Sequence, residues 1–251
     1  MAPGDFKDHF SGHATAYADA RPHYPDSLFA WLATLTPQHE LAWDCGTGNG
    51  QAAVALAKHY ARVIATDASV QQIESAFPCP NVEYRAVPAE RSGLAAHGVD
   101  LVTVAQAAHW FGLPAFYAEV RRVAKPGGAI VLWCYGLCSI APEVDAVIEE
   151  FYEGESKPYW PPERRLIDAG YRTLEFPFTE ITAPTIHMQQ HWSMAQLLAY
   201  LRTWSAVQRY IKQTGRDPIP ELEIAMAAAW GAAGSVKQID WPLHFRVGRI
   251  N

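Results

Sequence analysis

The sequence predicts an α/β fold with a doubly wound, mostly parallel sheet and helices on both faces. Two observations carry this prediction. Apolar runs of strand length alternate with segments of helical periodicity through the first half of the chain, and a glycine-rich turn follows the first such run. With 251 residues, of which 49% are hydrophobic, the chain can bury one large core, so we expect a single domain over residues 1–251.

The glycine-rich turn lies in LAWDCGTGNG, residues 41–50, where three glycines alternate with other residues after the acid Asp44. Glycine adopts backbone angles closed to other residues and lets a ligand approach closely. The following QAAVALAKHY carries apolar residues at helical spacing. A strand, a glycine turn and a helix in this order form the nucleotide-binding unit of open α/β sheets.

The alternation continues after this unit. The run VIA leads to a second strand that ends at Asp67, and Ser69 with Gln72 forms a plausible capping box for a short helix. A third strand is expected at 82–87.

The fourth strand, 99–105, is apolar almost throughout, as expected of a strand covered on both faces. A helical stripe between Leu113 and Val123 then ends at KPGG, residues 125–128, before the strand AIVLW.

The pattern is less regular after Gly136. Helices are predicted in PEVDAVIEEF and PPERRLIDAGY, an extended segment in FTEITAPTIHMQQHW, and a closing strand in PLHFRVGRI. Helices between about residues 190 and 232 are expected to cover the carboxyl edge of the sheet.

Charge and composition restrict the partners. The net charge of −6 and the absence of a basic cluster argue against nucleic acid. The sequence shows no signal peptide and no apolar run of membrane-spanning length, so we expect a cytoplasmic protein without a membrane partner. The four cysteines form no CxxC pair and the ten histidines no HExxH pattern, so no metal site is predicted.

The details of the turn indicate which nucleotide it holds. A dinucleotide fingerprint has a third glycine where this chain has Gln51, and Asp44 would repel a pyrophosphate. Both features disfavour an NAD-dependent oxidoreductase, one of the alternatives, and favour a ligand with a cationic group.

The segment DCGTGNG resembles the acid-x-Gly-x-Gly-x-Gly motif of class I S-adenosylmethionine-dependent methyltransferases. Asp67, about twenty residues after Gly46, matches the acid that accepts the ribose hydroxyls in that family. VPAER, residues 87–91, is similar to the motif that faces the adenine, although Pro88 replaces its usual acid. The resemblance implies a Rossmann-like, seven-stranded sheet and S-adenosyl-L-methionine as cofactor.

Three further segments are similar to the trans-aconitate methyltransferase-like group of small-molecule enzymes: FSGHATAYADARPHYP, AQAAHWF and YLRTWSAVQRY. This resemblance implies that residues 1–37 form a cap segment over the cofactor. It also implies that Arg21 lies near a carboxylate, either that of the cofactor or that of the substrate.

The expected cofactor-binding residues lie in these motifs: Tyr17, Arg21, Asp44, Gly46, Gly48, Gly50, Asp67, Ala68, Ala89, Glu90 and Gln106. The expected substrate-binding residues are Tyr24, Trp110 and Arg202. His109 follows the fourth strand, where ligands bind in such sheets, and is the candidate catalytic residue. It can act as a general base, donate a hydrogen bond to a substrate oxygen, or only hold its loop.

The predicted activity is methyl transfer from S-adenosylmethionine to a small molecule, first to an oxygen of a carboxylic acid. A hydroxyl or another small metabolite is the alternative acceptor. A non-catalytic module that only binds the cofactor remains a rival, because the cofactor motif does not establish turnover. The oligomeric state stays open.

Overall fold

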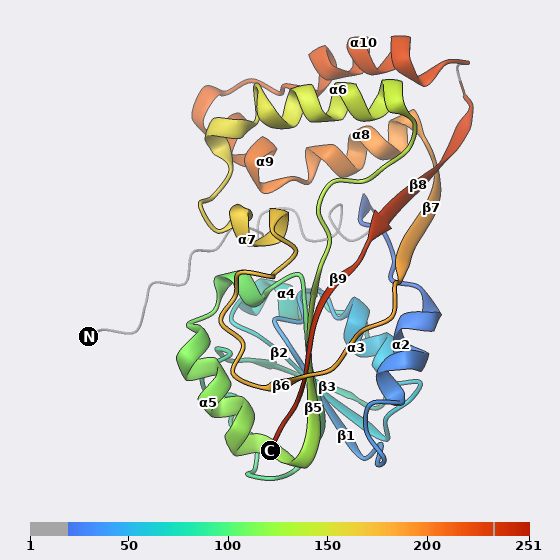
Figure 1. Ribbon diagram of the computed structural model, residues 1–251. Coiled ribbons are helices and arrows are strands. Elements are labelled where there is room, and N and C mark those ends of the chain that lie inside the picture. Colours follow the sequence, from blue (N-terminus) through green and yellow to red (C-terminus); the bar gives the residue numbers. More distant parts are fainter. Residues whose placement is uncertain (1–19, 233) are drawn as a thin grey trace.

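A seven-stranded sheet in the order β3-β2-β1-β4-β5-β9-β6 forms the centre of the computed structural model, which describes residues 20–232 and 234–251 (Figure 1). Its strands are β1 (Leu41–Cys45), β2 (Arg62–Asp67), β3 (Val82–Ala86), β4 (Val99–Ala105), β5 (Ala124–Cys134), β6 (Thr179–Glu180) and β9 (His244–Arg249). The first five strands pair in parallel, whereas β9 is antiparallel to β5 and β6. The predicted fold class is confirmed.

Helices pack on both faces of this sheet. They are α2 (Asp26–Ala33), α3 (Gln51–Leu56), α4 (Val70–Glu74) and α5 (Leu113–Val123). Successive residues of a strand point to opposite faces. In β5, Val131 and Trp133 therefore join the core beneath α2 and α3, while Ile130 and Leu132 join the core beneath α5.

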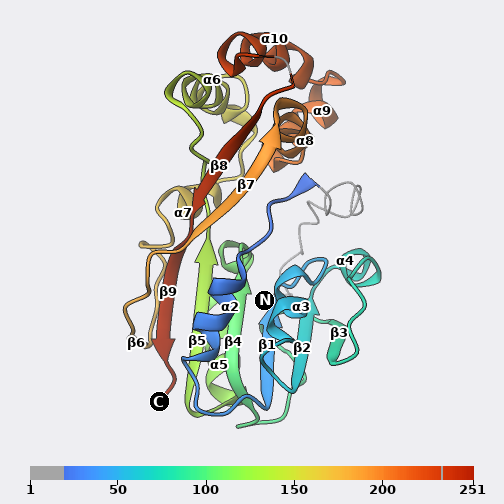
Figure 2. The same ribbon diagram turned by 90° about the vertical axis from the view of Figure 1, so that its right-hand side faces the viewer.

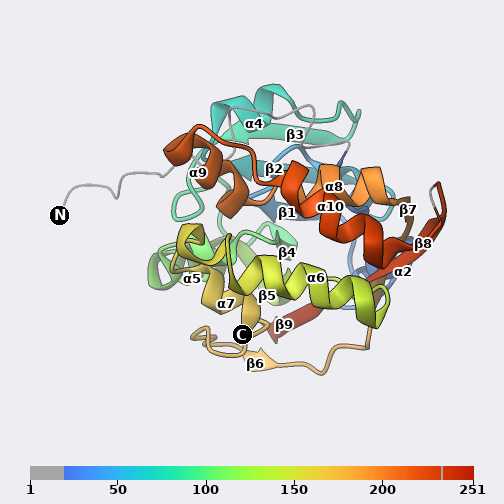
Figure 3. The ribbon, with the colours of Figure 1, turned by 90° about the horizontal axis from the view of Figure 1, so that it is seen from above.

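A second layer of helices stands above the carboxyl ends of β1 to β5 (Figures 1, 2 and 3). The segments from β5 to β8 are α6 (Pro142–Glu153), η3 (Lys157–Tyr159), α7 (Arg164–Asp168), β7 (His187–Ser193), α8 (Met194–Arg202), α9 (Ser205–Thr214), α10 (Ile219–Trp230) and β8 (Val236–Pro242). The antiparallel pair β7–β8 connects the layer to the sheet. Helix α6 also belongs to this layer, which the sequence prediction limited to residues 190–232.

The Lys-Pro-Gly-Gly segment differs from its prediction. It does not precede the fifth strand but lies within β5, next to a register shift between Val99 and Leu101 of β4. The strand passes close to its neighbour there, because a Cβ on Gly128 would lie 2.9 Å from the carbonyl oxygen of Asp100.

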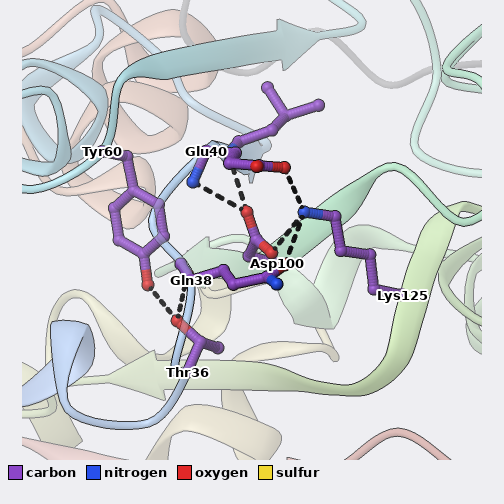
Figure 4. A network of polar contacts seen from close by, with 7 residues as sticks. Thr36, Gln38, Glu40, Tyr60, Asp100 and Lys125 are labelled. Atoms are coloured by element: carbon purple, nitrogen blue, oxygen red, sulfur yellow. Dashed lines mark hydrogen bonds and ion pairs between the residues drawn. The ribbon is translucent and has the colours of Figure 1, made fainter.

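A polar network closes the opposite end of the sheet (Figure 4). The buried carboxylate of Asp100 accepts the backbone N–H groups of Glu40 and Leu41, both at 2.9 Å, and lies 2.8 Å from Nζ of Lys125. Lys125 also contacts the Glu40 carboxylate at 2.6 Å. These contacts hold the entry to β1 against β4 and β5.

Within residues 20–232 and 234–251, no helix has the length and apolar character needed to cross a membrane.

Candidate active site

The glycine turn between β1 and α3 adopts a conformation that requires glycine. Gly46, Gly48 and Gly50 have φ angles of +71°, +56° and +86°, in the left-handed region. A Cβ on Gly46 would lie 2.6 Å from Cβ of Ala107, and a Cβ on Gly50 would overlap the ring of Tyr84. The turn is therefore pressed against neighbouring elements.

A cavity of about 870 Å³ opens beside this turn. It lies at the carboxyl ends of the strands, where the strand order reverses between β1 and β4, the usual ligand position in such sheets. Its volume falls within the range of small-molecule sites, roughly 300–1,000 Å³. Of the three turn glycines, Gly46 and Gly48 line the cavity. Gly50 is not among the lining residues and caps α3, so its expected contact with the cofactor stays a prediction.

Asp67 lines the cavity at the end of β2. Its carboxylate accepts the N–H of Gly48 on one oxygen and the N–H of Ser69 on the other, both at 2.9 Å. The two bonds orient the carboxylate at the rim between the glycine turn and α4, beside Ala68, which also lines the cavity.

Asp44 occupies a different place from the one its motif predicts. It is fully buried and is not among the residues that line the cavity. One carboxylate oxygen accepts from Oγ1 of Thr47 at 2.6 Å and the other from Oγ1 of Thr103 at 2.8 Å. Burial raises its pKa to about 6, although both threonine bonds act to lower it. Asp44 therefore supports the turn through its bond to Thr47, and its direct contact with a cationic ligand stays a prediction.

The segments after β3 and β4 also line the cavity. Ala89 and Glu90 line it, and Oε1 of Glu90 accepts the N–H of Gly112 at 2.8 Å. Gln106 also lines it, with a left-handed backbone of φ +56°. The Gln106 amide exchanges two hydrogen bonds with the backbone of Tyr135, at 2.9 and 3.0 Å, and so connects β4 to the end of β5.

A second, smaller cavity of about 60 Å³ adjoins the first and shares five lining residues with it: Arg21, Gln106, His109, Trp110 and Tyr135. Its other lining residues come from the upper layer and the approaches to it: Gly136, Trp160, Pro161, Arg164, Ile167, Tyr200, Trp204 and Ser205. Five aromatic side chains and two arginines thus line this cavity, and no carboxylate is among its described lining residues.

The two arginines are held in place by aromatic rings. Arg21 donates to the hydroxyl of Tyr135 at 3.2 Å, and its guanidinium lies 5.5 Å from the centre of the Tyr200 ring. Arg164 lies 4.5 Å from the centre of the Trp160 ring and forms an ion pair with Asp168 at 2.9 Å. A guanidinium fixed in this way can bind a carboxylate without further ordering.

His109 lies at the junction of the two cavities. Its Nδ1 is 2.8 Å from the hydroxyl of Tyr171, and its ring centre is 4.5 Å from that of Trp110. Burial, assisted by the positive charge of Arg164, lowers the pKa of His109 to about 3. The imidazole is therefore neutral near pH 7.

Two residues predicted to bind the substrate, Arg202 and Tyr24, do not line the smaller cavity. Arg202 is half exposed, forms an ion pair with Asp217 at 2.8 Å and lines neither cavity, so its expected substrate contact stays a prediction that this arrangement does not support. Tyr24, predicted to bind substrate, lines the larger cavity, where its ring packs edge-on against Trp133. Tyr17 lies outside the described residues.

Sequence reasoning missed several residues of this site: Tyr135, Trp160, Arg164 and Tyr200. Two of them had a usable signal: Tyr135 directly follows a predicted strand at the edge where ligands bind, and Tyr200 begins the segment YLRTWSAVQRY. Arg164 lies in a segment predicted only as a helix, and nothing in its spacing indicates the ring on which it stacks.

Comparison with known proteins agrees with this architecture. Residues 43–132 match a family model described as a methyltransferase domain. A protein of Dictyostelium discoideum named as a methyltransferase is 37% identical over 243 residues, which cover 95% of this chain and 92% of the relative.

Two solved structures extend the comparison. One from Anaeromyxobacter dehalogenans, described as a type II methyltransferase, is 46% identical, has a TM-score of 0.86, and covers 92% of this chain and 98% of its own. A methyltransferase structure from an antibiotic biosynthesis pathway of Anabaena variabilis shares the fold at 18% identity and a TM-score of 0.55, covering 87% of this chain and 98% of its own.

The chain belongs to the class I methyltransferases, and its cofactor is S-adenosylmethionine. The larger cavity fits this cofactor. Two backbone hydrogen bonds hold the carboxylate of Asp67 beside the glycine turn, and Gly46 in that turn has no room for a side chain. The NAD-dependent alternative is set aside by the same assignment.

Proposed function

We propose that this enzyme transfers a methyl group to a carboxylate oxygen of a small organic acid bound in the smaller cavity. The observation that carries the proposal is the charge of that cavity: Arg21 and Arg164 line its wall, no described lining residue is a carboxylate, and Asp168 pairs with Arg164 without lining the cavity. An anion is the complementary ligand. The resemblance to the trans-aconitate methyltransferase-like group supports the same choice.

The larger cavity supplies the residues for the cofactor. Asp67 is the candidate for the ribose hydroxyls, and Ala89 with Glu90 for the adenine, because all three residues line this cavity. Arg21 borders both cavities and can meet the carboxylate of either ligand. S-adenosylmethionine supplies a methyl group that its positively charged sulfur makes electrophilic.

The protein has little chemistry to add if the acceptor is a carboxylate. An ionised carboxylate needs no general base, so alignment and exclusion of water dominate, and good alignment reaches effective molarities of ~10⁵ M or more. The arginines orient the acid, the aromatic walls exclude water, and the neutral His109 can donate a hydrogen bond. A hydroxyl acceptor would need a base, and a pKa of about 3 makes His109 a poor one.

The chain is also proposed to act as one domain. One continuous hydrophobic cluster includes Leu28 of α2, Trp133 of β5, and Leu197 and Trp230 of the upper layer. A single cooperative unfolding transition measured by two spectroscopic probes is expected, and two separated transitions would contradict it.

The acceptor is tested by incubating the enzyme with labelled S-adenosylmethionine and a panel of small acids, each paired with its amide and its alcohol analogue. Methyl ester formation from acids alone is expected by mass spectrometry. Ethers from the alcohols would identify a hydroxyl methyltransferase. Cofactor binding with no transfer to any compound of the panel or of a metabolite extract would favour the non-catalytic rival.

A further inference from the structure

Tyr171 is a buried residue that no motif predicted. It follows α7, is fully buried and has a left-handed φ of +58°, an uncommon conformation for a bulky side chain. Nη1 of Arg246 donates to its carbonyl oxygen at 3.1 Å. The surrounding structure thus holds this residue in a conformation it would rarely adopt alone.

The hydroxyl of Tyr171 lies beside His109, in the segment Ala108–Trp110 that follows β4. Its oxygen is 2.8 Å from Nδ1 of His109. Among residues 20–232 and 234–251, this nitrogen is the one hydrogen-bond partner of the hydroxyl.

This arrangement determines where the phenol proton goes. A phenolic hydroxyl has one proton and can accept on its remaining lone pairs. If the hydroxyl accepted from an Nδ1–H of His109, its own proton would be a buried donor without an acceptor among the described residues, which is unfavourable. The phenol proton is therefore directed to Nδ1 of His109. Because Tyr171 is fully buried, solvent water does not compete for that proton.

A neutral imidazole that accepts at Nδ1 carries its own proton at Nε2. We propose that Tyr171 is a positioning residue that holds His109 in the Nε2–H tautomer, so that His109 presents a hydrogen-bond donor to the acceptor molecule. The hydrogen bond from His109 to the acceptor molecule rests on the proposed function, whereas the tautomer of His109 does not depend on it. A donor suits a carboxylate oxygen, and this tautomer would leave a hydroxyl acceptor without a base at that position.

The tautomer is measured by nitrogen NMR on ¹⁵N-labelled protein without any acceptor. The two ring nitrogens of a neutral histidine resonate far apart, so the spectrum identifies the protonated one. His109→Gln assigns the signal among the ten histidines of the chain. We expect an Nε2–H ring at neutral pH with a cross-peak from the Tyr171 hydroxyl proton to Nδ1. An Nδ1–H or doubly protonated ring would overturn the proposal.

The positioning role is tested with Tyr171→Phe, matched to Tyr117→Phe. Tyr117 is also buried, and its hydroxyl donates to the carbonyl oxygen of Glu175 at 2.8 Å, away from His109. Loss of the single tautomer is expected only in Tyr171→Phe. An unchanged Nε2–H signal in that variant would refute the role. If the variant does not fold, the parent spectrum and its cross-peak decide the question alone.

Kinetic measurements distinguish a His109 that donates a hydrogen bond from a His109 that acts as a general base. His109→Ala is expected to lower kcat/KM for the acid roughly 10- to 100-fold, the range for a hydrogen bond to a charged group. His109→Gln, whose amide N–H can reach the position of Nε2 but cannot act as a base, should recover part of this loss. Equal losses in the two variants would contradict the donor role. The panel of acids tests the acceptor separately, since the NMR result does not depend on it.

Discussion

The substitution Gly46→Ala tests whether the glycine turn depends on close approach as well as on backbone conformation. At φ +71° a residue with a Cβ costs about 1–2 kcal/mol relative to glycine. The new methyl would also lie 2.6 Å from Cβ of Ala107 and 3.0 Å from the Phe111 ring. Overpacking of this kind costs about 1–3 kcal/mol. The free energy of unfolding should therefore fall by about 2–5 kcal/mol.

The matched control is Gly127→Ala. Gly127 has a similar φ of +78°, but a Cβ there would meet no atom within 4 Å. The control should lose only about 1–2 kcal/mol, the cost of the backbone conformation. Urea denaturation measures both changes.

Binding of S-adenosylmethionine by calorimetry gives a second comparison. Gly46→Ala should weaken binding at least about tenfold, because the turn and Ala107 both line the cavity and must shift. Gly127 lies in β5, outside the described lining, so its variant should bind normally. Equal loss of stability in the two variants, or unchanged cofactor affinity in Gly46→Ala, would refute this reasoning.

Three further predictions concern charged groups. Arg164→Met should lower kcat/KM for the acid acceptor roughly 10- to 100-fold without changing cofactor affinity, whereas Arg202→Met should change neither. Burial raises the pKa of Asp44 from 3.8 to about 6, so the folded state binds the extra proton, and the stability from this group is lost as pH rises from about 4 to about 6. Asp44→Asn should remove that loss. The difference in the free energy of unfolding between the parent and this variant should therefore change by about 3 kcal/mol between pH 4 and pH 6. Asp100→Asn should cost about 1–3 kcal/mol of stability by weakening the buried contacts to Lys125 and the β1 entry, while Glu40→Gln, at an exposed carboxylate, should cost under about 1 kcal/mol.

Each of these has an outcome that contradicts it. Equal kinetic effects of Arg164→Met and Arg202→Met would remove Arg164 from the acceptor site. A difference between Asp44→Asn and the parent that does not vary between pH 4 and 6 would mean that Asp44 titrates as an exposed acid. Equal costs for Asp100→Asn and Glu40→Gln would show that burial adds nothing to the network at the end of the sheet.

The sequence by itself determined the parallel sheet, the glycine turn and the position of Asp67. These features depend on local properties, because strand and helix periodicity, left-handed glycine angles and the end of a strand are all written in contiguous residues. The family resemblance rested on the same local motifs, and the comparisons confirmed it at the level of class and cofactor.

Only the tertiary structure decided which side chains share the acceptor cavity. Arg164 is brought to Trp160 and the His109 ring by the folding of the upper layer over the sheet, and Tyr171 reaches His109 across 62 residues of chain. Arg202 carries the charge that the prediction sought but is turned outward to Asp217. Burial of Asp44 likewise follows from the packing of β1 between two strands. Charge and residue type are local properties, but the solvent exposure of a side chain and the identity of its partner depend on segments distant in the chain. The spacing of residues in the sequence therefore could not predict them.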